Sequence, residues 1–112
     1  MTDRELLELA AKAAGIFDEH EEVSDCTSGG FWLCDSGKGY QWNPLTNDGD
    51  ALGLAVKLHL TIRVWISAVI IEDNKGNRLA FEDTGCRAHE YEKDATRRAI
   101  VRAAAAIGEG MK

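Results

Sequence analysis

The sequence predicts an α+β domain in which a mainly antiparallel sheet of about four strands carries helices on both faces. Three capped segments have apolar residues at spacings of three and four, which is the pattern of amphipathic helices. A run rich in β-branched residues from Leu60 to Glu72 is typical of a strand. Glycine-containing segments at 35–39 and 73–77 predict tight turns between strands. At 112 residues the chain has the length of one domain, which we place at 1–112.

The first predicted helix covers about residues 3 to 14. Thr2 and Glu5 form a capping box, in which each side chain satisfies a backbone amide at the start of the helix. Gly15 can adopt the left-handed conformation that ends a helix. The apolar residues on one stripe are Leu6, Leu9, Ala10, Ala13 and Phe17.

The next 13 residues, 18–30, have neither a helical nor a strand period, and we interpret them as a mobile acidic loop. In the following segment, 31–42, aromatic residues flank Asp35–Gly39. This composition favours two short strands joined by a hairpin.

Pro44 directs the chain out of these strands, and Thr46, Asn47 or Asp48 could each cap a second helix at about 48–59. Its core face comprises Ala51, Leu54, Ala55 and Leu58. Because Leu52 and Val56 make most of the remaining circumference apolar, we expect this helix to be largely buried.

We interpret 60–72 as one strand, followed by a turn and an antiparallel strand at 78–82. Apolar residues alternate along one side of the run, while Trp65, Val69 and Ile71 fall on the other. Both sides therefore need cover, which favours helices on both faces of the sheet. Of Trp32, Trp42 and Trp65, we expect at least two in the core.

The last predicted helix covers about 93–108, ends at Gly108 and leaves 109–112 frayed. Ala99, Ile100 and Ala103 share its apolar face, whereas Arg98 and Arg102 lie on the opposite, outward face.

The net charge of −6 argues against a surface that binds phosphate backbones without regard to sequence. The charge is uneven, however. Residues 16–28 carry five acidic side chains and no basic one, and residues 93–112 carry five basic side chains against two acidic. The distinctive charges that could recognise a partner are Asp18, Glu19, Glu21, Glu22, Arg97, Arg98 and Arg102.

No catalytic, cofactor-binding or metal-ligating residue is identified. Cys26, Cys34 and Cys86 lack the short paired spacing of zinc sites, and their odd number fits free thiols better than a disulfide framework. A cysteine–histidine pair is available by number, but no local catalytic signature accompanies it. The apolar stretches are too short to span a membrane, and no secretory signal is visible, so we expect a cytoplasmic protein.

Three segments, MTDRELLELAAKAAGI, WNPLTNDGDALGLAVKL and DATRRAIVRAAAAIGEGM, resemble short phage and prophage proteins of the phage ABA sandwich domain family. The resemblance implies a three-layer α/β/α sandwich, a phage context and a location in the host cell. It implies no biochemical activity and no functional residue.

The sequence therefore predicts a non-enzymatic phage or prophage accessory protein without a cofactor, which binds an unidentified host or phage protein. The alternative is a nucleic-acid-associated phage protein that uses the basic last helix. A small enzyme without a visible motif is a third reading.

Overall fold

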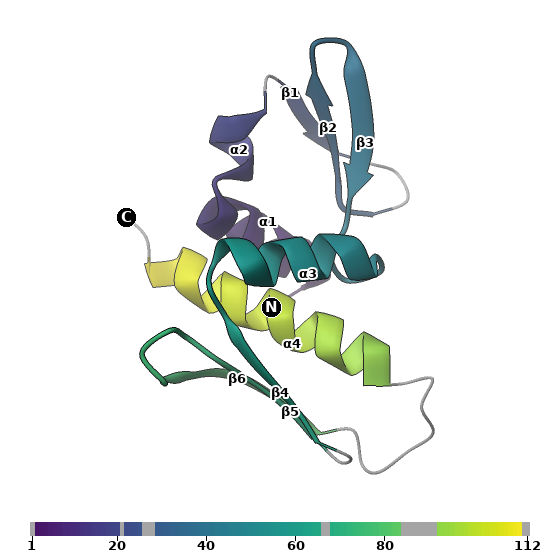
Figure 1. Ribbon diagram of the computed structural model, residues 1–112. Coiled ribbons are helices and arrows are strands. Elements are labelled where there is room, and N and C mark those ends of the chain that lie inside the picture. Colours follow the sequence, from purple (N-terminus) through teal and green to yellow (C-terminus); the bar gives the residue numbers. More distant parts are fainter. Residues whose placement is uncertain (1, 21, 26–28, 66–67, 84–91, 111–112) are drawn as a thin grey trace.

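The structure is a computed structural model that describes residues 2–20, 22–25, 29–65, 68–83 and 92–110. Helices and strands follow the chain in the order shown in Figure 1. They are α1 (Asp3–Ala14), α2 (Ile16–Glu19), β1 (Glu22–Asp25), β2 (Phe31–Asp35), β3 (Lys38–Trp42), α3 (Asp48–Lys57), β4 (Thr61–Val64), β5 (Ala68–Glu72), β6 (Arg78–Asp83) and α4 (Glu92–Gly110). The predicted α+β class is confirmed.

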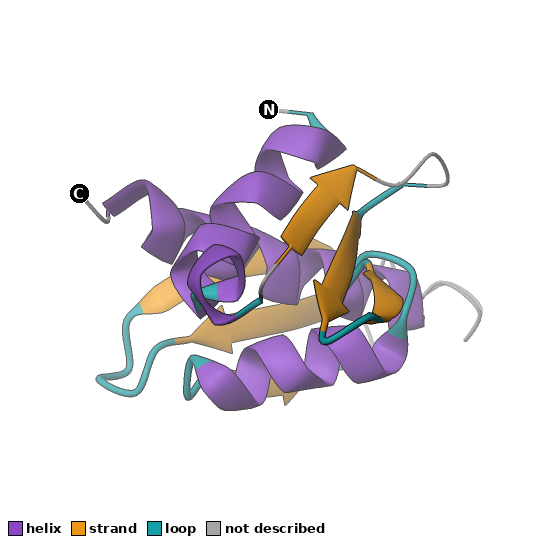
Figure 2. Cartoon of the chain, turned by 90° about the horizontal axis from the view of Figure 1, so that it is seen from above, coloured by secondary structure: helices purple, strands orange, loops and turns teal. Residues whose placement is uncertain are grey.

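The strands form two separate antiparallel sheets. Sheet A has the order β1-β2-β3, and sheet B has the order β4-β5-β6. Figures 1 and 2 show α1, α3 and α4 between the two sheets. The prediction of one sheet of about four strands with helices on both faces is therefore wrong in strand number and in layering.

The run 60–72 is a hairpin rather than one strand. β4 pairs with β5 in the register Thr61↔Glu72 to Val64↔Val69, so the chain reverses between Val64 and Ala68. No glycine, proline, asparagine or aspartate occurs between Leu60 and Ile71. Because Ser67 is the one turn-favouring residue in this stretch, the alternating pattern predicted a continuous strand.

The acidic segment contains a strand that the sequence did not predict. β1 pairs with β2 from Glu22↔Cys34 to Asp25↔Phe31. Only one of its four residues, Val23, is apolar. Backbone hydrogen bonds to β2 therefore hold this edge strand without an apolar period, and the expectation of a loop over all of 18–30 is wrong.

Both predicted hairpin turns are present. Ser36 and Gly37, with φ of 52° and 81°, join β2 to β3, as two-residue hairpin loops require. At 73–77 the Asp73 carboxylate accepts from the backbone amides of Lys75 and Asn77 at 2.8 and 2.9 Å. β6 then returns antiparallel to β5, as predicted.

The starts of α1 and α3 follow the predicted capping residues. The Thr2 hydroxyl accepts from the Glu5 amide at 3.2 Å, and Gly15 ends α1 with φ of 71°. Of the three candidate caps for α3, Asn47 is the N-cap, because its side chain accepts from the Asp50 amide at 2.9 Å.

α1 packs against α4 through alanines, and a glycine allows the closest approach. A Cβ atom added at Gly108 would lie 2.1 Å from the Leu9 carbonyl oxygen. Gly108 is buried inside α4, which continues to Gly110. The predicted end at Gly108 is therefore wrong, because this glycine serves helix packing rather than helix termination.

The core connects all the layers. The inner side of sheet A is covered by Phe31, Leu33 and Trp42, and the inner side of sheet B is covered by Val69 and Ile71. Val101 of α4 lies between the two sheets. All six side chains are at most 5% exposed. Only Trp42 of the three tryptophans is in this core. Trp32 and Trp65 are 44% and 54% exposed, so the expectation of two core tryptophans is wrong.

Candidate functional site

α3 presents an apolar face on each side. Ala51, Leu54 and Ala55 are at most 3% exposed and pack into the core. Leu52 and Val56 on the other side are 60% and 65% exposed. The expectation of a largely buried helix is wrong on this side, because no described element covers these two side chains.

A hydrogen-bond network around Asn43 sets the direction of α3. Asn43 is buried, and its backbone amide donates to the Asp50 carboxylate at 2.9 Å. Its side-chain oxygen accepts from the Leu45 amide at 3.0 Å. Together with the Asn47 cap, these bonds fix the chain between β3 and the first turn of α3.

Sheet B presents a second apolar surface next to α3. β4 is an edge strand, and alternate side chains point to the same face of a sheet. Ile62 and Val64 therefore share the inner face with Val69 and Ile71, which pack against α4. Val69 and Ile71 are fully buried, but Val64 is 55% exposed.

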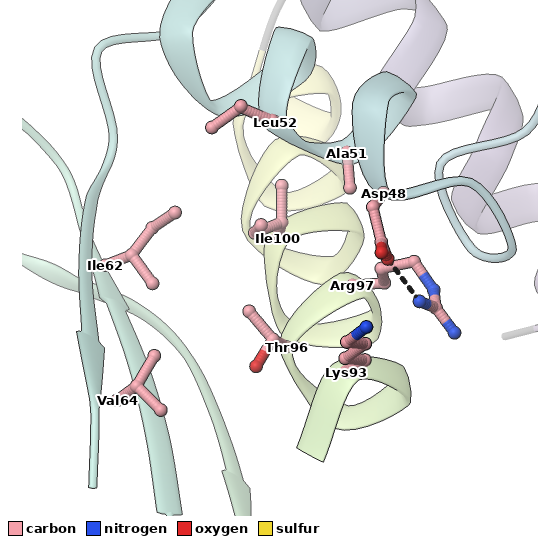
Figure 3. A pocket seen from close by; sticks show the side chains of 9 residues that line it. All are labelled: Asp48, Ala51, Leu52, Ile62, Val64, Lys93, Thr96, Arg97 and Ile100. Atoms are coloured by element: carbon pink, nitrogen blue, oxygen red, sulfur yellow. Dashed lines mark hydrogen bonds and ion pairs between the residues drawn. The ribbon is translucent and has the colours of Figure 1, made fainter. Parts of the chain in front are cut away.

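These elements enclose a groove, which we call the α3–β4–α4 groove. Its volume is about 350 Å³. Its lining residues are Asp48, Ala51 and Leu52 of α3, Ile62 and Val64 of β4, and Lys93, Thr96, Arg97 and Ile100 of α4. In Figure 3, Leu52 lies at one end, and Val64 and Lys93 lie toward the other.

The groove has an apolar interior and a charged rim. Arg97 forms ion pairs with Asp48 of α3 and Asp94 of α4, and its Nε donates to the Leu45 carbonyl oxygen at 2.9 Å. The Arg97 side chain is only 13% exposed. The guanidinium therefore fastens α4 to the start of α3 and fixes one wall of the groove.

The other two predicted arginines also form ion pairs between elements. Arg98 contacts Asp3 of α1 with an Nη1–Oδ1 distance of 3.0 Å, and this hydrogen bond raises the pKa of the guanidinium above its ordinary value. Arg102 Nη1 lies 2.5 Å from the buried Glu82 Oε1 of β6. All three arginines of α4 thus have carboxylate partners within the fold.

The predicted acidic residues lie elsewhere in the chain. Asp18 and Glu19 belong to α2 and Glu22 to β1, and Asp18 and Glu22 are exposed. Glu21 lies outside the described residues. The ion pairs that the structure describes join none of these acids to the arginines of α4. Their role in partner binding stays a prediction.

A second cavity, of about 280 Å³, lies between α1, α3 and sheet A. His20 lines it, and its Nδ1 atom lies 2.6 Å from Asp35 Oδ2, with the histidine side chain 12% exposed. The Tyr40 ring contacts the imidazole edge-on at 6.0 Å between centroids. The carboxylate orients the imidazole and connects α2 to sheet A.

This cavity lacks the parts of a nucleophilic site among its described lining. Its walls contain no serine, threonine, cysteine or lysine. Cys34 is a half-buried free thiol that follows Leu33 in β2, so its side chain points to the face opposite Asp35. Cys26, Cys86 and His89 lie outside the described residues. The described His, Cys, Asp and Glu residues form no group of three or more that could hold a metal ion.

Sequence reasoning did not identify the groove. The signal was the surplus of apolar residues around α3, since Leu52 and Val56 exceed what one buried face requires. A helix with apolar residues around most of its circumference is typically covered on more than one side, but the sequence does not say whether the cover belongs to the same chain.

Comparisons with models of protein families, with curated proteins and with solved structures found no match to this chain. Among the residues that the structure describes, no helix has the length and hydropathy needed to cross a membrane. The resemblance to the phage ABA sandwich domain family thus stays a prediction.

Proposed function

We propose that this chain is a phage or prophage accessory protein of the host cytoplasm that acts without catalysis by binding another protein. The α3–β4–α4 groove is its binding surface. The observation that carries this proposal is a set of three exposed apolar side chains: Leu52 and Val64 line the groove, and Val56 lies one turn from Leu52 on α3. Leu52, Val56 and Val64 are each more than half exposed, although they lie next to a buried core.

The physical argument is that burial of these side chains in a complex is favourable, at about 25 cal/mol per Å² of apolar surface. Contiguous exposed apolar surface with a polar rim is characteristic of protein-binding sites. The groove volume of about 350 Å³ accommodates a few side chains of a partner. Asp48, Arg97 and Asp94 provide the polar rim.

The alternative, a nucleic-acid-associated protein that uses the last helix, has less support. Affinity for a phosphate backbone comes from cations that replace the condensed counterions of the nucleic acid. Arg97, Arg98 and Arg102 are each engaged with a carboxylate of the fold. Binding of phosphate would therefore have to break these ion pairs.

Comparative capture tests the proposal. The affinity-tagged protein is expressed in a bacterial host with and without phage infection, and captured proteins are quantified for four forms. These are the wild type, the groove variant Leu52→Ser/Val56→Ser, the acidic-segment variant Glu19→Lys/Glu21→Lys/Glu22→Lys, and Phe81→Ser as a matched control. Phe81 is 47% exposed and lies in β6 on the outer face of sheet B.

We expect one partner to be lost from the groove variant and retained by the other variants, with all melting temperatures close to that of the wild type. Equal capture by the wild type and the groove variant would contradict the proposal. Loss only from the acidic-segment variant would place binding at Asp18–Glu22 instead. DNA binding with a steep salt dependence, abolished by Arg98→Glu/Arg102→Glu, would favour the alternative function.

A further inference from the structure

Within the described part of the chain no strand pairs with the outer edge of β4, so this edge of sheet B offers backbone hydrogen-bonding groups beside the groove. Trp65 and Ala68 exchange backbone hydrogen bonds at 2.8 and 3.4 Å. In an antiparallel pair of strands, hydrogen-bonded and non-hydrogen-bonded residue pairs alternate. Counting back from the bonded pair Trp65–Ala68, Val64↔Val69 is not bonded, Arg63↔Ile70 is bonded, and Ile62↔Ile71 is not bonded. The N–H and C=O groups of Ile62 and Val64 therefore point away from β5, toward the free edge.

The same two residues also line the groove with their side chains. A chain that extended sheet B beyond β4 would pair with the backbone of Ile62 and Val64 and direct alternate side chains to the inner face. On that face, its side chains would meet the groove and the exposed Leu52 of α3 (Figure 3). A chain added along β4 could therefore pair with its backbone and bury apolar side chains in the groove at the same time, in a single register.

We propose that the groove binds an extended segment of the partner protein, which adds to sheet B as a fourth strand along β4. This inference rests on the proposed function and specifies the class of partner. The segment carries apolar residues at alternate positions, opposite Val64 and Ile62. β4 provides four residues of edge, or about 13 Å at about 3.3 Å per residue, so the paired stretch is short.

The positive charge of Lys93 at the end of the groove adds one requirement on the sequence of the bound segment. Lys93 is exposed on α4, at the same end of the groove as Val64 on β4 (Figure 3), and it has no carboxylate partner among the residues that the structure describes. A segment antiparallel to β4 begins at this end. An acidic residue two positions before its first apolar residue would share the inner face and lie near the Lys93 ammonium.

The occupant is a partner segment rather than a second copy of this chain. In the two-fold register that bonds Ile62 to Val64 of the copy, Arg63 would lie directly opposite the other Arg63. Each Arg63 pairs with its own Glu72 at 2.7 Å, but like charges opposite one another still destabilise a sheet. The net charge of −6 on each copy adds to the repulsion.

A peptide of defined design tests this inference. The probe is the acetylated and amidated hexapeptide Glu-Thr-Val-Thr-Val-Thr, titrated into isotope-labelled wild-type protein and followed by amide NMR shifts and hydrogen exchange. Two N-methylated forms provide matched controls. Methyl groups on the two valine amides remove the donors that face β4, whereas methyl groups on the threonine amides lie on the opposite edge.

We expect the amides of Ile62 and Val64 to shift and to exchange at least about tenfold more slowly, with smaller changes at Arg63, which already bonds to β5. Methylation of the valine amides should weaken binding at least about tenfold, which is the loss of about 1.4 kcal/mol, and methylation of the threonine amides should weaken it less. Val64→Pro removes one outward donor from the edge without removing a β4–β5 bond, and it should weaken binding in the same direction as valine methylation but by less.

Equal binding of the two methylated peptides, or no shift at Ile62 and Val64 with millimolar peptide, would overturn strand addition. If groove-dependent capture persists in that case, the proposed function stands and only the mode of binding fails. A wild-type dimer in sedimentation that Val64→Pro converts to a monomer would assign the edge to a second copy and overturn the partner segment. The peptide experiments on wild-type protein do not depend on the folding of any variant.

Discussion

Neighbouring residues of the same type have different structural roles in α4. Arg97 is 13% exposed and binds two carboxylates and a backbone carbonyl, whereas the Arg98 side chain is 38% exposed and pairs with an exposed Asp3. Exposed ion pairs contribute about 0–1 kcal/mol. Hydrogen bonds to a mostly buried charged group contribute more, and their loss leaves partners without a donor.

We therefore predict that Arg97→Ala lowers the free energy of unfolding by about 1.5–3 kcal/mol, and Arg98→Ala by less than about 1 kcal/mol. Urea denaturation of both variants measures this difference. Equal losses would show that the Arg97 contacts do not hold α4 against α3.

The turn between β5 and β6 contains a carboxylate, Asp73, with a lowered pKa. The amide and side chain of Asn77 donate to Asp73, and these bonds lower the pKa of the Asp73 carboxyl below its ordinary value. Because the pKa of the Asp73 carboxyl is lower in the folded state than in the unfolded state, the ionised carboxylate stabilises the fold at pH values above the unfolded-state pKa. That contribution is lost as pH falls through the folded pKa.

NMR titration of the Asp73 carboxyl should accordingly show a midpoint below that of an aspartate in a peptide. Asn77→Gly removes the side-chain donor and should raise the midpoint toward the ordinary value. An unchanged midpoint in this variant would mean that the backbone amides alone set the pKa.

At the scale of elements, helix packing and helix propensity make opposite predictions for the same substitution. Alanine favours a helix over glycine by about 1 kcal/mol. Gly53 lies in α3 with no atom within 4 Å of an added Cβ, whereas a Cβ at Gly108 would lie 2.1 Å from the Leu9 carbonyl oxygen. The backbone clash at Gly108 exceeds the gain in propensity.

Gly53→Ala should therefore raise the melting temperature, and Gly108→Ala should lower it by an amount equivalent to about 1–3 kcal/mol. Calorimetry of the two variants provides the comparison. Stabilisation by Gly108→Ala would contradict the close approach of α1 and α4.

The two faces of α3 predict unequal effects of truncation. Leu54 is 3% exposed in the core, and Leu52 is 60% exposed on the groove. Leu54→Ala should cost about 2–5 kcal/mol because it leaves a cavity. Leu52→Ala should cost no more than about 0.5 kcal/mol. Denaturant melts with similar losses for both variants would show that Leu52 is covered in solution.

The helices α1, α3 and α4 were predictable because their caps and periods are local, whereas the short α2 (Ile16–Glu19) was not predicted. Thr2, Asn47 and Gly15 act within one turn of the residues they cap. The strands were less predictable, since the reversal between Val64 and Ala68 has only Ser67 as a turn-favouring residue and β1 has no apolar period. Pairing with another strand, and not the local sequence, decides such segments.

For the whole molecule, layering and the site depend on contacts between distant parts of the sequence. Asp3 and Arg98 are 95 positions apart, and Asp48 and Arg97 are 49 apart. The sequence therefore predicted a basic outer face on α4, but not the carboxylates that neutralise it. The groove was equally hidden, because it forms only when α3, β4 and α4 come together.

We propose that the partner binds in the α3–β4–α4 groove. Site-specific photo-crosslinking in the host tests it most directly, with a photoreactive amino acid placed at Leu52 or, for comparison, at Phe81 or Glu22. All three side chains are exposed, so each position tolerates the replacement. We predict a discrete crosslinked partner from position 52 and none from positions 81 and 22. Crosslinks to one partner from position 22 alone would contradict this account and move the binding surface to the acidic segment.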